Sequence, residues 1–169
     1  MAYNVLFLCT GNSARSIMAE ALLGVLGKSR FAAYSAGSHP TGSGQPMAAE
    51  FATNLGYPPE KLRSKSWDEY ALADAPHMDF VITVCDNAAG EVCPIWPGHP
   101  IAAHWGVPDP AAVEGDEDER RAAFRDAFAT LRRRVDLLIA LPIDKLDQLA
   151  RERELRAIAA SDGQPPANR

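Results

Sequence analysis

Residues 5–16 read VLFLCTGNSARS, and this stretch predicts how the fold begins. The apolar run at 5–8 has the length and composition of a buried strand. A polar segment with one glycine follows at 9–16. Residues 17–26 then space their apolar side chains along one face of a helix, and Gly27 is placed to end it. The chain is therefore expected to open with a strand, a polar loop and a helix.

The rest of the chain alternates strand-like and helix-like segments. Further strands are expected at 31–35, 80–84 and 101–105, and further helices at 47–55, 67–73, 119–141 and 143–160. Strands that alternate with helices form a parallel sheet with helices on both faces. We expect one α/β domain over residues 1–141, a helical extension over residues 142–160 and a disordered tail over residues 161–169.

The composition favours a cytoplasmic protein. The 169 residues are 47% hydrophobic, which is enough to bury a core, and the formal net charge is -5. A negative net charge argues against nucleic acid or an anionic membrane as the main partner. The sequence shows neither a signal-peptide pattern nor an apolar stretch long enough for a membrane span. Three cysteines, an odd number, suit catalysis, metal binding or packing better than a secreted disulfide framework.

The polar segment at 9–16 has the features of an oxyanion-binding loop. Between a strand and a helix, unpaired backbone N–H groups and the helix dipole converge on one point, where a tetrahedral anion can bind. Gly11 allows the backbone to turn inward, and the planar guanidinium of Arg15 can bind two anion oxygens. Cys9 lies at the base of the loop, where these groups are expected to lower the pKa of its thiol and make it a nucleophile. The residues expected to bind the anion are Thr10, Gly11, Asn12, Ser13, Ala14, Arg15 and Ser16.

The same segment carries a family resemblance. The sequence from Cys9 to Ser16, followed by Met18-Ala19-Glu20, resembles the signature of the low-molecular-weight protein tyrosine phosphatases and their arsenate reductase branch. Residues 34–37 (YSAG) and 107–110 (VPDP) extend the resemblance over about residues 3–141. It implies a single-domain, three-layer α/β/α fold with a four-stranded parallel sheet flanked by helices.

Asp109 is the expected general acid. It lies between Pro108 and Pro110, which stiffen the segment and hold the carboxyl group in place. A leaving oxygen needs a proton, and a positioned aspartate can supply it. The residues alone also allow an ordinary turn aspartate, whereas the resemblance implies the catalytic role.

The three cysteines favour reduction over hydrolysis. Reducing arsenate to arsenite takes two electrons, which two thiols can supply by forming a disulfide. Cys85 ends the strand that begins at Phe80, so it is expected at the same sheet edge as Cys9. Cys93 follows in a loop and is a third thiol that can carry the disulfide away from Cys9.

The segment from Val84 to Cys93 resembles the redox segment of the thioredoxin-coupled arsenate reductases. That resemblance implies that Cys9 attacks arsenate while Asp109 helps to expel water. Cys85 then attacks the Cys9–arsenic adduct, which releases arsenite and leaves a Cys9–Cys85 disulfide. Cys93 attacks Cys85, and an external dithiol resets the Cys85–Cys93 bond. Thioredoxin is the expected donor, with glutathione and glutaredoxin as the alternative, and no cofactor is required.

A phosphatase is the main alternative. Phosphatase members of the family usually have a second cysteine where this chain has Ala14, a proline where it has Ile17, and aromatic residues where 111–113 read AAV. Weak phosphatase activity is still expected, because phosphate, like sulfate, mimics arsenate. The remoter alternatives are a non-catalytic oxyanion-binding protein and a zinc protein that uses Cys85, Cys93, His99 and His104.

The remaining expectations concern ions and partners. Some relatives bind a potassium ion near the loop, and the residues that match its oxygen ligands are Asn12, Glu20, Ser35, Ser66 and Asp68. The protein is expected to be a monomer or a weak homodimer. The apolar residues Leu149, Leu155 and Ile158 of the last helix are candidates for docking a second subunit.

Overall fold

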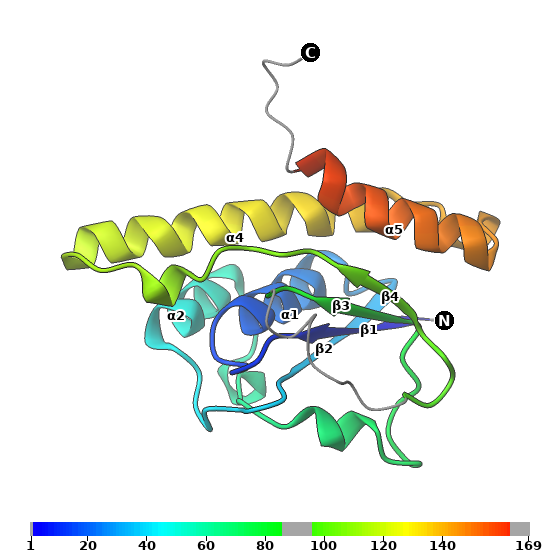
Figure 1. Cartoon of the computed structure of the whole chain (residues 1–169), viewed down its shortest axis with the longest axis horizontal. Coiled ribbons are helices and arrows are strands. Elements are labelled where there is room, and N and C mark those ends of the chain that lie inside the picture. The colour runs from blue at the N-terminus through cyan, green and yellow to red at the C-terminus, as the bar shows by residue number, and fades with distance from the viewer. Residues whose placement is uncertain (1, 86–95, 163–169) are drawn as a thin grey trace.

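Four parallel strands form the centre of the molecule. The computed structural model describes residues 2–85 and 96–162 (Figure 1). The strands are β1 (Tyr3–Leu8), β2 (Phe31–Ala36), β3 (Phe80–Thr83) and β4 (Ile101–His104). They lie in the order β2-β1-β3-β4, and each neighbouring pair is parallel. The predicted four-stranded parallel sheet is confirmed.

Helices of two kinds surround the sheet. The bounds are α1 (Arg15–Leu26), α2 (Pro46–Leu55), α4 (Glu117–Ala140) and α5 (Gln148–Asp162), and the short 3-10 helices are η1 (Pro59–Lys61), η2 (Trp67–Tyr70), η3 (Pro110–Ala112) and η4 (Ile143–Lys145). Within the described part of the chain, none of them is both long enough and apolar enough to cross a bilayer.

Two predicted helices differ from those observed. The helix expected at 67–73 is the shorter 3-10 helix η2. The helix expected at 143–160 begins only at Gln148, because η4 comes first and the Asp147 carboxylate then accepts a hydrogen bond from the Ala150 N–H at 2.8 Å. The last helix is therefore separate from α4, with its own N-terminal cap.

The two faces of the sheet are covered differently. Alternate residues of β1, such as Val5 and Phe7, point to the face that α1, α2, α4 and α5 cover. In Figure 1, α4 and α5 run along the upper side of this layer. On the other face, Leu6 and Leu8 pack with the aromatic side chains of η2 and with Trp96. Both faces are buried, which explains why the β1 sequence is apolar at consecutive positions.

The C-terminal helix α5 packs into the main core. Leu155 and Ile158 are buried in it, and the Trp105 indole N–H donates a 3.0 Å hydrogen bond to the carbonyl of Leu155. The hypothesis that Leu155 and Ile158 dock a second subunit is therefore wrong, because the chain's own core covers them. Leu149 is 69% exposed. Of the tail expected at 161–169, residues 161 and 162 belong to α5, and the remainder lies outside the described residues.

We predict that Leu155→Ala lowers the free energy of unfolding by about 2–4 kcal/mol, because it leaves a cavity in a packed core. Leu149→Ala is the matched control on the same helix, and it should change the free energy of unfolding by less than about 0.5 kcal/mol. Urea unfolding followed by circular dichroism measures both. Equal effects of the two substitutions would show that α5 is not part of the core.

Candidate active site

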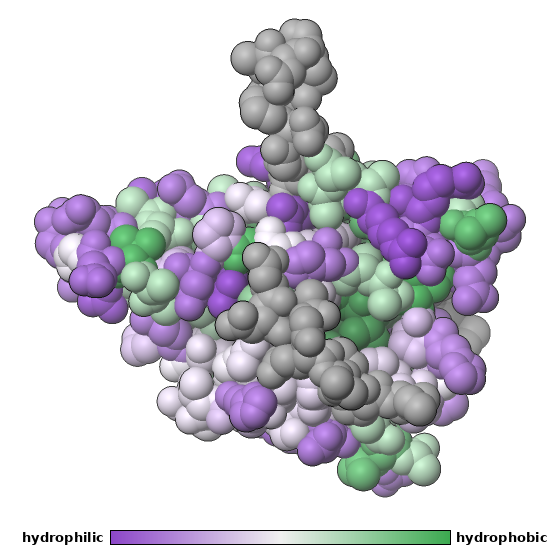
Figure 2. Space-filling model, in the orientation of Figure 1, coloured by the Kyte–Doolittle hydropathy of each residue, from purple (hydrophilic) through white to green (hydrophobic). Residues whose placement is uncertain are grey.

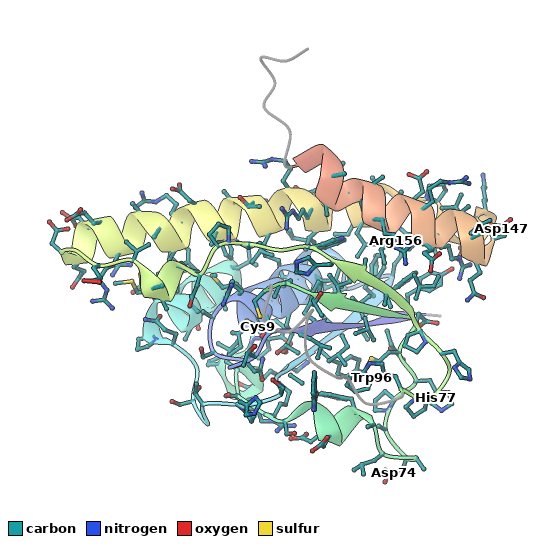
Figure 3. The ribbon with its side chains drawn as sticks, in the orientation of Figure 1. Cys9, Asp74, His77, Trp96, Asp147 and Arg156 are labelled. Carbon is teal, nitrogen blue, oxygen red and sulfur yellow. The ribbon has the colours of Figure 1, made fainter. Side chains whose placement is uncertain are left out.

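The candidate site lies at the carboxyl edge of the sheet. Cys9 directly follows β1, and Cys85 lies just beyond the end of β3. Parallel strands bring both ends to one edge, which is where open α/β sheets bind ligands. Figure 3 shows Cys9 at the end of β1, below α4. The sequence prediction that these two cysteines share an edge is confirmed.

The backbone of the loop is turned so that three of its carbonyl groups face outward. The carbonyl oxygens of Thr10, Gly11 and Ser13 accept hydrogen bonds from main-chain N–H groups within residues 39–45, at 2.9, 3.1 and 2.7 Å. The C=O and N–H of one trans peptide point in opposite directions. The N–H groups of Gly11 and Ala14 therefore face the inner side of the loop, and that of Gly11 is directed at the Cys9 thiol.

The N-terminus of α1 adds further donors. Its N-cap residue, Ala14, has no side-chain acceptor for the first-turn N–H groups. By contrast, Asp116 caps α4 through a reciprocal pair of hydrogen bonds with Glu119. An N-terminus without a side-chain cap presents its N–H groups and its dipole to an anion. The predicted oxyanion loop thus presents N–H donors and the positive end of a helix dipole, as anion binding requires.

Asn12 stabilises the conformation of the loop through buried hydrogen bonds. It is fully buried, and its φ of 44° lies in the left-handed region, which few residues other than glycine adopt. The NH₂ group of its side chain donates to the hydroxyls of Ser16 (2.8 Å) and Ser35 (3.0 Å). The oxygen of the same side chain, Oδ1, accepts from the main-chain N–H of Lys65 (2.8 Å). These three bonds tie the loop to α1, to β2 and to the segment before η2.

Gly37 is a residue whose role the sequence did not reveal. A Cβ at this position would lie 2.4 Å from the Thr10 carbonyl oxygen and 2.5 Å from that of Cys9. Only glycine permits the end of β2 to lie this close to the loop. The resemblance at residues 34–37 marks the segment, but the close contact that requires glycine is visible only in three dimensions.

Cys9 and Cys85 are in contact at the base of the loop. Both are buried free thiols, and the side chain of Cys85 is hydrogen-bonded to that of Cys9. The sulfur of Cys85 also accepts a hydrogen bond from the Thr10 N–H at 3.3 Å. A second thiol is therefore already within reach of the nucleophile.

The pKa of Cys9 was predicted to be lowered, and the net direction of that prediction is wrong. The contact with Cys85 and burial raise the pKa of the Cys9 thiol. The Arg15 guanidinium and the Gly11 N–H do lower it, as expected, but they are outweighed.

Arg15 connects the loop to Asp109. One guanidinium N–H donates to the Val107 carbonyl at 2.9 Å, and a second nitrogen lies 3.7 Å from the Asp109 carboxylate. The Nε–H is buried and has no hydrogen-bond partner among the described residues, which makes it a donor available to an oxyanion. The Asp109 side chain is 42% exposed, and its other oxygen accepts from the Ala111 N–H. The predicted acid thus lies beside the predicted anion-binding arginine.

The zinc hypothesis is not supported by the residues that can be placed. His99 precedes β4 and Cys85 follows β3, so they lie at opposite edges of the parallel sheet. His104 shares a 2.7 Å hydrogen bond with Thr83. Across residues 2–85 and 96–162, no three His, Cys, Asp or Glu side chains are grouped to hold a metal ion. Cys93, which the zinc and relay hypotheses both use, lies outside the described residues.

Three of the five expected potassium ligands form one hydrogen-bonded chain. The amide of Asn12 donates to Ser35, whose hydroxyl donates to Glu20 at 2.5 Å. Ser66 instead accepts from the Asp68 N–H and caps η2. The Lys65 ammonium lies 3.8 Å from the Glu20 carboxylate, so a positive charge already neighbours this oxygen. Potassium binding remains a prediction.

Comparison with known proteins agrees with this geometry. The model of the low molecular weight phosphotyrosine protein phosphatase family matches residues 4–155. An arsenate reductase of Halalkalibacterium halodurans is 38% identical over 121 residues, which make up 72% of this chain and 84% of the relative. The crystal structure of an arsenate reductase from Archaeoglobus fulgidus has a TM-score of 0.62 and 28% identity, with coverage of 81% of this chain and 99% of that one. A thioredoxin-dependent arsenate reductase of Corynebacterium glutamicum has a TM-score of 0.52 and 28% identity, with coverage of 81% and 63%.

The contact between the two thiols gives a prediction for Cys85→Ala. Because Cys85 is the largest cause of the raised pKa of Cys9, its removal should lower that pKa and shift the alkylation of Cys9 by iodoacetamide to lower pH. Mass spectrometry assigns the alkylated residue, with Cys9→Ser as the control. An unchanged alkylation profile would mean that the two thiols are not coupled.

Proposed function

Because the chain belongs to the low molecular weight phosphotyrosine protein phosphatase family, we propose that it is an arsenate reductase that uses Cys9, Cys85 and Cys93 in turn. One observation carries the proposal: the thiol of Cys85 is in contact with the nucleophile at the base of an oxyanion-binding loop. Hydrolysis of a phosphate ester needs a single thiol, whereas reduction of arsenate needs a pair.

The loop binds the substrate by charge and geometry. Arsenate would accept hydrogen bonds from the inward N–H groups of the loop, from the first turn of α1 and from the buried Nε–H of Arg15. Phosphate and sulfate have the same tetrahedral shape and would compete. These donors place the central atom above the sulfur of Cys9.

The first chemical step forms a bond between Cys9 and arsenic. The raised pKa of Cys9 fits a reaction in which the thiol and the bound oxyanion share one proton, which passes to an oxygen of arsenate as the sulfur attacks. Asp109, beside Arg15, donates a proton to the leaving oxygen, which departs as water.

Cys85 completes the reduction. Its sulfur attacks that of Cys9 and the sulfur–arsenic bond breaks. The electron pair of that bond stays on arsenic, and the arsenic group takes up the proton of the Cys85 thiol as it leaves as arsenite. Arsenate and two thiols thus yield arsenite, one disulfide and water. Cys93 would then form a disulfide with Cys85 and free Cys9. An external dithiol, thioredoxin in preference to glutathione with glutaredoxin, reduces the bond between Cys85 and Cys93.

The similarity to the thioredoxin-dependent enzyme of Corynebacterium glutamicum supports thioredoxin as the donor. The relay also needs thiols that are kept reduced, which supports a cytoplasmic location as part of the proposal. The family resemblance supports arsenic detoxification as the purpose of the reaction.

The phosphatase alternative has less support from the cavity beside Asp109. A cavity of about 280 Å³ borders Asp109, between η3 and α4. The described side chains that line it are small, apolar or acidic, and none is aromatic: Val107, Pro108, Asp109, Pro110, Val113, Ala123, Asp126, Ala127 and Thr130. Among these described side chains, a phosphotyrosine ring would find no ring to stack on.

We predict arsenate-dependent oxidation of a thioredoxin system by the purified protein. Cys9→Ser should abolish turnover, since it removes the nucleophile. Parallel assays with glutathione plus glutaredoxin and with a phosphatase substrate identify the donor and the size of any phosphatase activity. Efficient hydrolysis of phosphotyrosine without arsenate reduction would assign the chain to the phosphatases.

Cys93→Ser should stall recycling after one reaction cycle. Without the Cys93 thiol, nothing in the chain attacks Cys85 to break the Cys9–Cys85 disulfide. The form of the protein with this disulfide should therefore accumulate, and peptide mapping by mass spectrometry detects it. Steady multiple turnover of this variant would exclude Cys93 from the relay.

Asp109→Asn should slow the chemical step by about 10²–10⁴-fold, the usual contribution of a positioned general acid. The amide still accepts the hydrogen bond from the Ala111 N–H, so η3 should keep its cap. Oxyanion binding should change little. A single-turnover rate equal to that of the wild type would remove Asp109 from the mechanism.

A further inference from the structure

Helix α4 carries one of its arginines on its buried face. The surface along this helix is largely hydrophilic in Figure 2, as expected where charged side chains face solvent. Arg134 does not belong to that surface, because it is 6% exposed and lies between Leu131 and Leu138 in the stripe of buried residues. An arginine in an apolar stripe costs free energy unless its guanidinium is hydrogen-bonded. What the guanidinium of Arg134 binds is therefore informative.

Arg134 binds the peptide that leads from β4 toward Asp109. One of its nitrogens donates to the Gly106 carbonyl at 3.1 Å. The N–H of the same peptide, that of Val107, donates to the carbonyl of Val84, just beyond β3, at 3.0 Å. Because the two groups of a trans peptide point in opposite directions, the Gly106 carbonyl points away from β3. β4 is an edge strand of the described sheet, so Arg134 supplies there a donor that a neighbouring strand would otherwise provide.

Arg15 binds the next carbonyl of the same segment. Its guanidinium donates to the Val107 carbonyl at 2.9 Å and lies 3.7 Å from the Asp109 carboxylate. Two arginines from two helices, α1 and α4, thus bind the successive carbonyls of Gly106 and Val107. Because both carbonyls and the intervening N–H have partners, the orientation of the peptide between them is fixed.

The prolines on either side of Asp109 increase the importance of these carbonyl contacts. Proline has no N–H, so Pro108 and Pro110 cannot attach the segment by main-chain donation. The hydrogen bonds that attach the start of the segment are therefore those of the Gly106–Val107 peptide and of the Val107 carbonyl. A rotation of that peptide would displace the Asp109 carboxylate that follows it.

We propose that Arg134 is a positioning residue for Asp109: by binding the Gly106 carbonyl, it orients the peptide that leads to the acid, so that the Asp109 carboxylate lies beside Arg15. This role rests on the proposed function, in which Asp109 is the general acid. It requires no contact between Arg134 and the substrate.

Arg134→Met tests this role, because methionine fills much of the same buried space but donates no hydrogen bond. On mixing with arsenate, the reduced variant should release arsenite in a single turnover about 10–10²-fold more slowly than the wild type, since a displacement of about 1 Å can cost 10²-fold. Sulfate affinity, measured by calorimetry, should change little, because the loop and the first turn of α1 keep their N–H donors. Arg134→Lys keeps a charged donor and should recover part of the rate.

Arg132→Met is the matched control. It makes the same chemical change two positions earlier on α4, where the side chain is exposed. This variant should release arsenite at the wild-type rate. Equal rates for Arg134→Met and Arg132→Met would overturn the proposal.

Combination with Asp109→Asn separates positioning from a general loss of stability. If Arg134 acts through the acid, Arg134→Met should slow arsenite release by less than about twofold once the carboxylate is already absent. Any loss of thermal stability should persist in that background. Slowing by the same factor with and without the Asp109 carboxylate would mean that Arg134 does not act through it.

Crystal structures of Arg134→Met and Arg132→Met give a readout that does not depend on the reaction. We expect the Asp109 carboxylate to lie away from Arg15 in Arg134→Met and beside it in Arg132→Met. A wild-type protein that releases no arsenite would refute the proposed function, and these structures would still decide whether Arg134 positions Asp109. An Asp109 carboxylate that stays beside Arg15 in Arg134→Met would contradict the role of Arg134.

Discussion

The close contact between Gly37 and the loop at Cys9 and Thr10 constrains the rest of the site. With no side chain at Gly37, the end of β2 lies against the loop, and the segment that follows it supplies N–H groups to the outward carbonyls. The N–H groups of Gly11 and Ala14 then face inward, toward the space above Cys9. The anion-binding polarity of the loop is thus a property of backbone packing, to which Arg15 adds a charged donor.

This polarity alone does not distinguish hydrolysis from reduction. The difference lies at the end of β3, where the sheet places Cys85 against Cys9. That contact raises the pKa of the nucleophile, which would be a disadvantage for a simple thiolate. In the proposed reaction this contact places the second thiol beside the first, where the two can form a disulfide. The family relationship and the similarity to arsenate reductases agree with this interpretation.

Features encoded by local patterns were predictable from the sequence. The strand–loop–helix order and the shared edge of Cys9 and Cys85 follow from periodicity and parallel topology. The position of Asp109 beside Arg15 agrees with the role that the family resemblance implied. The partners of Glu20 were not predictable, because Tyr57 and Lys65 reach it only through tertiary packing. The net pKa shift of Cys9 and the burial of Leu155 and Ile158 depend in the same way on contacts between distant segments.

The central claim is that arsenic is reduced by the protein's own thiols. The direct measurement is to mix reduced protein with arsenate in the absence of any external reductant, and to determine arsenite and free thiols together. The account predicts one arsenite released for each pair of thiols lost, and no further reaction. Release of no arsenite, or unchanged thiols after prolonged incubation, would contradict it.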